Sequence, residues 1–242
     1  MTLTISKCRR LLPFFAVALF TVACAPLTVP PKAEYPVGRA RLELPPGAWQ
    51  DLGTSDEAIA GSGGRISLQT RDVGLRSAQG DWLGVLHVQT NRAGDRSGSP
   101  QGIGYCPPQQ DVTVEDAAAA GSPVRADCLR LKRWGSSAQW LDKNRPDLVQ
   151  WLGSRQIVWS QPYTYLSYRY VTEAGAWVNV DALVDQRLLR PTTRNNEEFL
   201  VAGRPALKWG QDLAQAVRVS AGMMDGHLAI PPFPFPTPTS RP

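Results

Sequence analysis

The sequence contains few of the residues that hold metal ions or build basic surfaces. Two histidines, four cysteines and five lysines, against 21 arginines, occur in 242 residues. Without the N-terminal Lys7, Arg9 and Arg10, 23 basic residues face 21 acidic ones. A nucleic-acid-binding domain usually keeps a clustered basic patch, but Asp127 interrupts the basic stretch Arg125–Arg133. We therefore expect no nucleic-acid partner, no metal ion and no cofactor.

The short motifs of common catalytic sites are also missing. The chain has no Gly-X-Ser-X-Gly turn and no Gly-Lys-Ser/Thr phosphate-binding loop. His87 lies between Leu86 and Val88 in a strand-like run, which favours a structural histidine over a catalytic one. We therefore predict no enzymatic activity. A hydrolase that assembles from dispersed residues, with His87 near an acid and a serine, is one alternative.

The N-terminal apolar run is too short for a transmembrane helix. Leu11–Val22 has twelve residues and would span about 18 Å as a helix, against roughly 30 Å of hydrocarbon. A basic segment precedes it and Thr21-Val22-Ala23-Cys24 ends it, which is typical of a signal peptide. These last four residues resemble the lipobox of bacterial lipoproteins, with Thr21 where leucine is usual.

The resemblance to bacterial lipoproteins implies a lipid anchor on Cys24. In that class the thiol carries a diacylglyceryl group, the peptidase cuts before the cysteine, and the new amine is acylated. Several acyl chains hold a protein firmly on a membrane. Ala25, rather than aspartate, follows Cys24, and the resemblance then implies the outer membrane, with the domain facing the periplasm. Cleavage by the general signal peptidase, which would release a soluble protein, is the alternative.

Two cysteines remain after processing, because Cys8 leaves with the signal peptide and Cys24 takes the lipid. An even remainder in an exported chain predicts a disulfide between Cys106 and Cys128. Closing a loop of about 23 residues would stabilise the fold by roughly 3 kcal/mol. A redox pair is the less favoured interpretation, because catalytic thiols usually occur as Cys-X-X-Cys.

Periodicity predicts an α+β fold, an antiparallel sheet with one or two covering helices and one disulfide. The predicted strands are 37–44, 66–70, 82–90, 124–134, 155–160, 163–172 and 177–184; the predicted helices are a short one after Pro146 and a long one over 195–224, broken near residue 203. The expected organisation is a signal peptide (1–23), a proline-rich tether (24–36), a single domain (37–228) and a proline-rich extended tail (229–242). This order of elements resembles that of PsbP-like lipoproteins.

Aromatic residues are the unusual feature of the central region. Trp134, Trp140, Trp151 and Trp159 lie within 26 residues and are followed by Tyr163 and Tyr165. Such rings can fill a protein interface or stack on sugars, although packing in the core is the simpler interpretation. We expect a non-enzymatic envelope protein that binds another envelope component, most simply a protein. A module that binds carbohydrate or peptidoglycan through these six residues is the alternative.

Overall fold

The structure is a computed structural model that describes residues 33–61, 64–92, 106–191, 193–201, 204–223 and 226–236. Residues 1–30 and 31–242 form two separate units, and every described residue belongs to the second. Cys24, the predicted signal peptide and the tether as far as residue 32 lie outside the described residues, as do residues 237–242.

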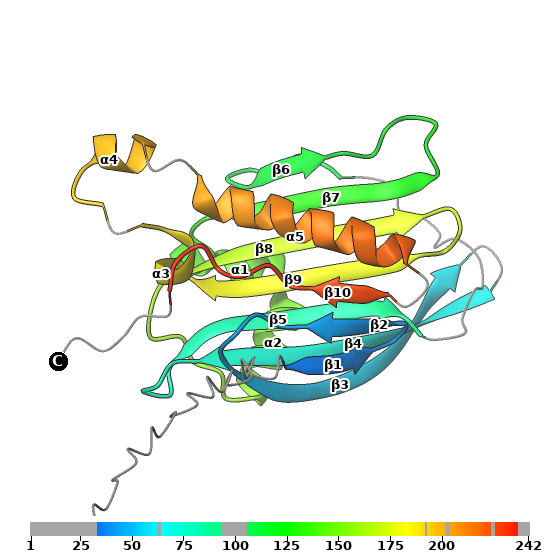
Figure 1. The fold of residues 1–242 in the computed structure, drawn as a ribbon, viewed down its shortest axis with the longest axis horizontal. Helices are drawn as coiled ribbons and strands as arrows, with labels where there is room; N and C mark the ends of the chain where they lie inside the picture. The colour runs from blue at the N-terminus through cyan, green and yellow to red at the C-terminus, as the bar shows by residue number, and fades with distance from the viewer. Residues whose placement is uncertain are drawn as a thin grey trace, which may run out of the picture. The chain divides into compact units, whose positions relative to one another are not determined.

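The fold is built on a seven-stranded antiparallel sheet (Figure 1). Its strands, in spatial order, are β3 (Ala48–Gly61), β4 (Gly64–Arg76), β5 (Trp82–Asn91), β9 (Trp177–Asp185), β8 (Tyr163–Thr172), β7 (Val124–Lys132) and β6 (Thr113–Asp116). Neighbouring strands are joined mainly by hairpins, and β9 carries the chain back to the centre beside β5. This confirms the predicted antiparallel α+β class.

A small second sheet lies over β4 and β5 on one face of the large sheet (Figure 1). It consists of β1 (Glu34–Val37), β2 (Ala40–Glu43) and β10 (His227–Ala229), with β10 parallel to β2. Its buried residues Leu42 and Leu228 join the main core. The first strand therefore begins inside the segment expected to be a tether.

Helices cover both faces of the large sheet. The helical elements are η1 (Ser137–Gln139), α1 (Trp140–Asn144), α2 (Pro146–Ser154), α3 (Gln186–Leu189), α4 (Asn196–Val201) and α5 (Pro205–Gly222). The long helix α5 crosses β7, β8 and β9 on the face that carries the small sheet, and α1 and α2 lie behind the sheet in Figure 1. The division into α4 and α5 confirms the predicted break, because Pro205 begins a new helix and cannot continue an old one.

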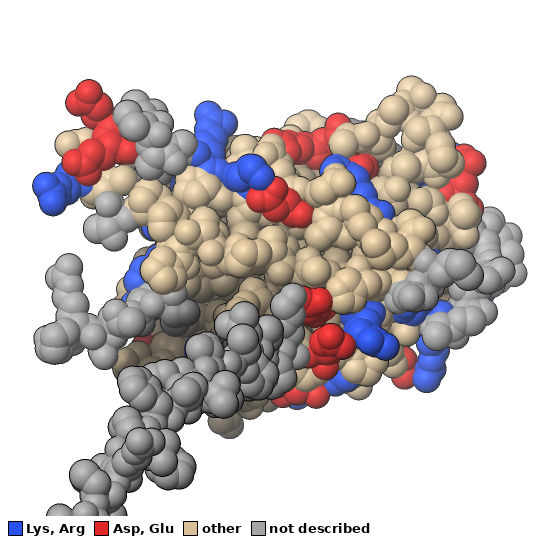
Figure 2. All heavy atoms as spheres, in the orientation of Figure 1, with Lys and Arg blue, Asp and Glu red and all other residues tan. Residues whose placement is uncertain are grey.

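The close approach of α5 to the sheet depends on a glycine. A Cβ atom added at Gly210 would lie 2.6 Å from Leu166 Cδ1, which belongs to β8. The buried stripe of α5, including Trp209, Leu213 and Val217, packs on the apolar side of β8 and β9. On this side of the molecule, the Lys, Arg, Asp and Glu side chains visible in Figure 2 are interspersed, without a patch of one sign among the described residues.

The disulfide between Cys106 and Cys128 is confirmed, with the two Cα atoms 5.6 Å apart. The predicted strand over 155–160 is wrong, because Arg155 ends α2 and Gln156 adopts a left-handed backbone with φ of 55°. Ile157 is instead buried under α2. Four strands were not predicted: β3, a long and mostly exposed edge strand, and the short strands β1, β6 and β10.

The segment after β10 packs against the domain although it forms no helix or strand up to residue 236. Ile230 is buried, and the ring of Phe233 stacks on Trp209 and Trp49 at centroid distances of 5.2 and 6.4 Å. The backbone N–H of Phe235 donates to the carbonyl of Leu188. The proline-rich end expected as a tail therefore contributes to the core over its described part.

Candidate functional site

The face of the large sheet opposite α5 carries a band of polar side chains. Alternation along β9 places Val178 and Val180 in the core under α5, whereas Asn179 and Asp181 point to the opposite face. Strand register aligns polar residues of neighbouring strands into two rows across the sheet. The first row is Asp72, His87, Asp181, Ser167 and Arg130; the second is Thr70, Gln89, Asn179 and Arg169. We call these two rows the polar band.

Apolar clusters border the polar band at both ends. At one end, Leu148 and Leu152 of α2 and Leu141 of α1 pack on Val85 and Leu183 of the sheet. At the other end, a second cluster consists of Ile66, Leu68, Ala126, Val171 and Trp177. The two short helices cover only the first of these clusters, so part of the polar band faces a pocket.

The pocket has a volume of about 260 Å³ and walls from three parts of the chain. Its floor is the polar band on β7, β8 and β9, and one wall comes from Trp140 to Asp147 of the helical segment. The third wall is the segment after Cys106, where Gln109 Nε2 donates to Asn144 Oδ1 over 2.7 Å. Because Cys106 is bonded to Cys128 of β7, the disulfide fixes this wall to the sheet.

Asp181 is the buried acid of the pocket, with 2% of its surface exposed. Its Oδ1 accepts from Arg145 Nη1 over 2.6 Å and from the Tyr165 hydroxyl over 2.7 Å, and its Oδ2 accepts from Asn179 Nδ2 over 3.0 Å. Burial by itself would raise the pKa of Asp181, but the Arg145 charge and these hydrogen bonds hold it below its usual value. The carboxylate is therefore ionised, and both of its oxygens accept hydrogen bonds.

Arg145 reaches the pocket because a proline follows it. Pro146 begins α2, and the residue before a proline is driven out of the helical region. Arg145 accordingly has φ of −142° and ψ of 59°, between α1 and α2. Its guanidinium binds Asp181 on one side and Asp147 on the other, with Nη2 2.8 Å from Asp147 Oδ2. Asp147 and Asp181, the two acids that line the pocket, thus both bind Arg145.

Arg130 and Arg169 have no acidic partner in the part of the chain that the structure describes. Arg130 Nη2 makes a long hydrogen bond of 3.4 Å to the Pro107 carbonyl, and the Arg169 guanidinium lies 5.6 Å from the Trp177 ring centroid. The Nε atoms of both arginines are buried without a hydrogen-bond partner. Burial and the neighbouring charges of Arg130 and Arg145 lower the pKa of Arg169, against the opposing effect of Asp181. The pocket therefore lacks negative charge at this point.

Asn179 adds an unused acceptor next to these arginines. The residue is 8% exposed, and its Nδ2 donates a hydrogen bond to Asp181 Oδ2. Its Oδ1 is buried and has no hydrogen-bond partner. Asn179 lies directly opposite Arg169 in the β8–β9 ladder, which places the two Cβ atoms about 5 Å apart. Unsatisfied donors and an unsatisfied acceptor therefore lie side by side.

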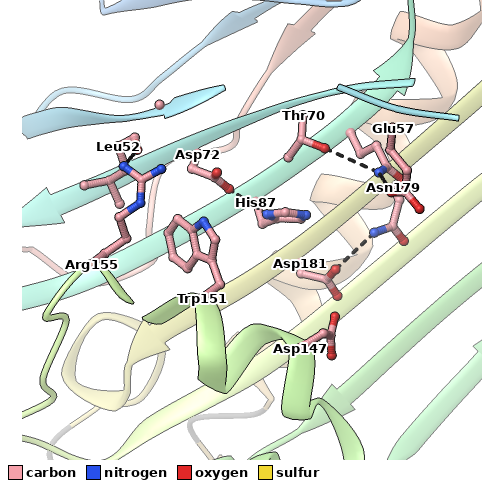
Figure 3. A network of polar contacts seen from close by, with 12 residues as sticks. Leu52, Glu57, Thr70, Asp72, His87, Asp147, Trp151, Arg155, Asn179 and Asp181 are labelled. Carbon is pink, nitrogen blue, oxygen red and sulfur yellow. Dashed lines mark hydrogen bonds and ion pairs between the residues drawn. The ribbon is translucent and has the colours of Figure 1, made fainter. Parts of the chain in front are cut away.

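The other half of the polar band is internally satisfied (Figure 3). His87 Nδ1 lies 2.6 Å from Asp72 Oδ1, and Trp151 of α2 contacts the His87 ring edge-on at 6.3 Å between centroids. Burial would lower the pKa of His87, but the hydrogen bond and charge of Asp72 and the charge of Asp181 raise it above 6.5. Gln89 donates to Glu57 over 3.1 Å and to Thr70 over 3.3 Å.

Ser167 and His87, a possible nucleophile and a possible base, are not within hydrogen-bonding distance of each other. Ser167 and His87 share the first row, but Asp181 lies between them, so they are two strands apart, or about 10 Å. A general base must lie within hydrogen-bonding distance of the proton that it removes. No group of three or more His, Cys, Asp or Glu side chains that could hold a metal ion occurs among the described residues.

Five of the six predicted aromatic residues gather around the first apolar cluster. Trp140, Trp151, Trp159 and Tyr163 are partly buried against it and Tyr165 is buried within it. Only Trp140 and Tyr165, with ring centroids 5.4 Å apart, also line the pocket. Trp134 is 44% exposed and does not belong to that cluster; the Arg190 guanidinium lies 4.9 Å from its ring centroid.

The charged residues of the pocket were not identified from the sequence. Arg130, Arg145, Arg169 and Asp181 come from three strands and a helix junction, and no short motif joins them. One signal was available in Trp177–Val184, where Asn179 and Asp181 alternate with valines. Two polar residues that face one side of an otherwise apolar strand indicate a polar site or a partner on that side.

Comparisons of the chain with family models, with curated proteins and with solved structures gave no match. In the part of the chain that the structure describes, no helix combines the length and hydrophobicity needed to cross a membrane.

Proposed function

We propose that this chain is a lipid-anchored lipoprotein of the outer membrane, facing the periplasm, whose domain binds another envelope component at the pocket without catalysing a reaction. The observation that carries the binding role is the pair of arginines, Arg130 and Arg169, which line an open pocket and have no acidic partner among the described residues. A charged group with a buried and unpartnered N–H is costly to a fold, and this cost favours a role in binding.

The anchor rests on the lipobox resemblance and is tested by localisation. The full chain is expected to sediment with membranes and to need detergent for release. A Cys24→Ser variant, which cannot take the lipid, is expected in the soluble periplasmic fraction. If the Cys24→Ser variant stays in the membrane after high-salt washing, lipid attachment at Cys24 is not what holds the protein there.

The binding role is tested by co-purification from gently solubilised envelopes. We expect the full chain to retain a stoichiometric partner, and an Arg169→Gln variant to lose most of it. Arg125→Gln is the matched control, because Arg125 is exposed on the same strand as Arg130 and pairs with Glu173 away from the pocket. Equal retention by both variants would rule out the pocket as the contact site.

A carbohydrate-binding module is the second candidate, since Trp140 forms part of the pocket wall and packs on Tyr165. Aromatic rings beside amide and carboxylate groups suit sugar recognition. Titration with soluble cell-wall fragments in the millimolar range would then show saturable binding that a Trp140→Ala variant loses. If the full chain shows no saturable binding of these fragments, the carbohydrate-binding function is excluded.

A further inference from the structure

The balance of charges in the pocket gives the chemical class of its ligand. Three guanidinium groups, those of Arg130, Arg145 and Arg169, face the carboxylates of Asp147 and Asp181. Both carboxylates bind Arg145, at 2.8 and 2.6 Å. Asp181 also accepts hydrogen bonds from the Tyr165 hydroxyl and from Asn179 Nδ2. Neither acid forms a hydrogen bond or ion pair with Arg130 or Arg169, so among the described residues no negative charge pairs with these two arginines.

The missing group must offer acceptors with a geometry that arginine prefers. A guanidinium binds a planar carboxylate through two parallel hydrogen bonds, and such charge-assisted bonds are about twice as strong as neutral ones. Arg130 is on β7 and Arg169 on β8, and both line the pocket. An anion in this place would also relieve the repulsion among the three arginines.

Asn179 adds a second requirement, because its unpartnered Oδ1 needs a donor. The Nδ2 atom is already bound to Asp181, so turning the amide over would place an acceptor against a carboxylate. A simple anion satisfies the arginines and leaves Asn179 unsatisfied. A ligand that carries an N–H or O–H group next to its carboxylate satisfies both, since Asn179 and Arg169 are neighbours on adjacent strands.

The size of the pocket limits the ligand further. Its volume of about 260 Å³ lies just below the range of about 300–1,000 Å³ that is typical of small-molecule pockets. This accommodates an amino-acid-sized group, or the end of a longer chain that enters from solvent.

We propose that the pocket binds an α-substituted carboxylate, in which an amide N–H or a hydroxyl is attached to the carbon next to the carboxylate. The carboxylate binds Arg169 and Arg130, and the N–H or O–H donates to Asn179 Oδ1. The end of a peptide supplies the amide form and a hydroxy acid supplies the hydroxyl form. This inference rests on the proposed binding role of the pocket and names the group that it recognises.

The test is a calorimetric titration of the full chain in detergent with four probes: N-acetylalanine, lactate, propionate and N-acetylalanine amide. We expect saturable binding of N-acetylalanine or lactate, binding of propionate about ten times weaker because it lacks the donor, and no binding of the amide. The better of the first two probes identifies the amide or the hydroxyl form. The inference would be overturned if propionate bound as tightly as both N-acetylalanine and lactate. It would also be overturned if neither N-acetylalanine nor lactate bound.

Variants assign the binding to the residues named. Loss of one charge-assisted contact in Arg169→Gln should weaken binding about ten- to a hundredfold, with Arg125→Gln unchanged. Asn179→Leu should abolish the preference for N-acetylalanine or lactate over propionate. If Arg169→Gln does not fold, as judged by its thermal melt, Arg130→Gln provides the same test, because Arg130 makes only one long hydrogen bond. Wild-type affinity in a folded Arg169→Gln or Arg130→Gln variant would refute the assignment.

The two proposals fail in different ways. If neither N-acetylalanine nor lactate binds but a partner co-purifies and depends on Arg169, the binding role stands and the ligand class is wrong. If an acid binds but no partner co-purifies, the ligand class stands and the macromolecular partner is wrong.

Discussion

Replacing Asp181 with leucine tests the buried network beneath the pocket. The substitution leaves the Arg145 guanidinium with Asp147 as its remaining acid and leaves Asn179 Nδ2 without an acceptor. Removing one partner of a buried ion pair costs about 3–5 kcal/mol, because the other charge stays buried. Arg145 retains 24% side-chain exposure, so we expect the lower part of this range, about 3 kcal/mol of unfolding free energy.

The control for this prediction uses the other acid on the same arginine. Asp147 binds Arg145 with similar geometry, but its side chain is 65% exposed. Solvent screens such a pair, and its loss typically costs less than about 1 kcal/mol. An Asp147→Asn variant should therefore unfold close to the wild type.

The assay is urea unfolding of the full chain in detergent at pH 7, followed by tryptophan fluorescence, for both variants and for the Arg145→Leu, Asp181→Leu double variant. The double variant should lose less stability than the two single changes added together, since no buried charge remains unpaired. An Asp181→Leu variant no less stable than Asp147→Asn would refute this account of the network.

Acidification should weaken the same network in the wild type. The folded pKa of Asp181 is below its unfolded value of 3.8, so its contribution is present above pH 3.8 and is lost as pH falls through the folded pKa. The stability difference between wild type and Asp181→Leu should shrink over that range, measured as urea midpoints at pH 7, 4 and 3; a constant difference would contradict the lowered pKa.

Three further predictions concern the rest of the domain. A His87→Gln variant should lose more stability at pH 5.5 than at pH 8.5, because the raised pKa of His87 stabilises the fold below 6.5 and this gain disappears as pH rises through the folded value; equal losses in urea midpoints would contradict it. A Cys106→Ser, Cys128→Ser double variant should be about 3 kcal/mol less stable and melt at a lower temperature; an unchanged melting temperature would contradict the structural role of the disulfide. A Phe233→Ala variant should lose about 1–3 kcal/mol through its stacking on Trp209, measured by thermal unfolding, whereas a free tail would lose nothing.

The sequence predicted the central strands well because their side chains alternate between two clearly different environments. The hairpin of β8 and β9 and the helix break before Pro205 follow from local pattern and from proline chemistry. The edge strand β3 was missed because its exposed residues give no apolar alternation. The strand predicted over 155–160 failed because Ile157 is apolar for another reason, its burial beneath α2.

The pocket could be predicted only in part, because tertiary register creates it. Trp140 and Tyr165 were candidates from the start, but Arg130, Arg169 and Asp181 become neighbours only when β7, β8 and β9 pair. The disulfide was predictable from the number of cysteines, whereas its contribution to the pocket wall through the segment after Cys106 was not. The position of Arg145 depends on Pro146 and on the packing of α2.

Site-specific photocrosslinking in cells tests most directly the claim that the pocket is the binding site. The photoreactive p-benzoylphenylalanine replaces Trp140 in the pocket wall in one variant, and Val219, 43% exposed on α5, in the other. We predict that the residue at position 140 crosslinks to an envelope component, and that the residue at position 219 on the opposite side of the sheet does not. A crosslink from position 219 alone, or none from position 140 in a correctly localised protein, would contradict the claim.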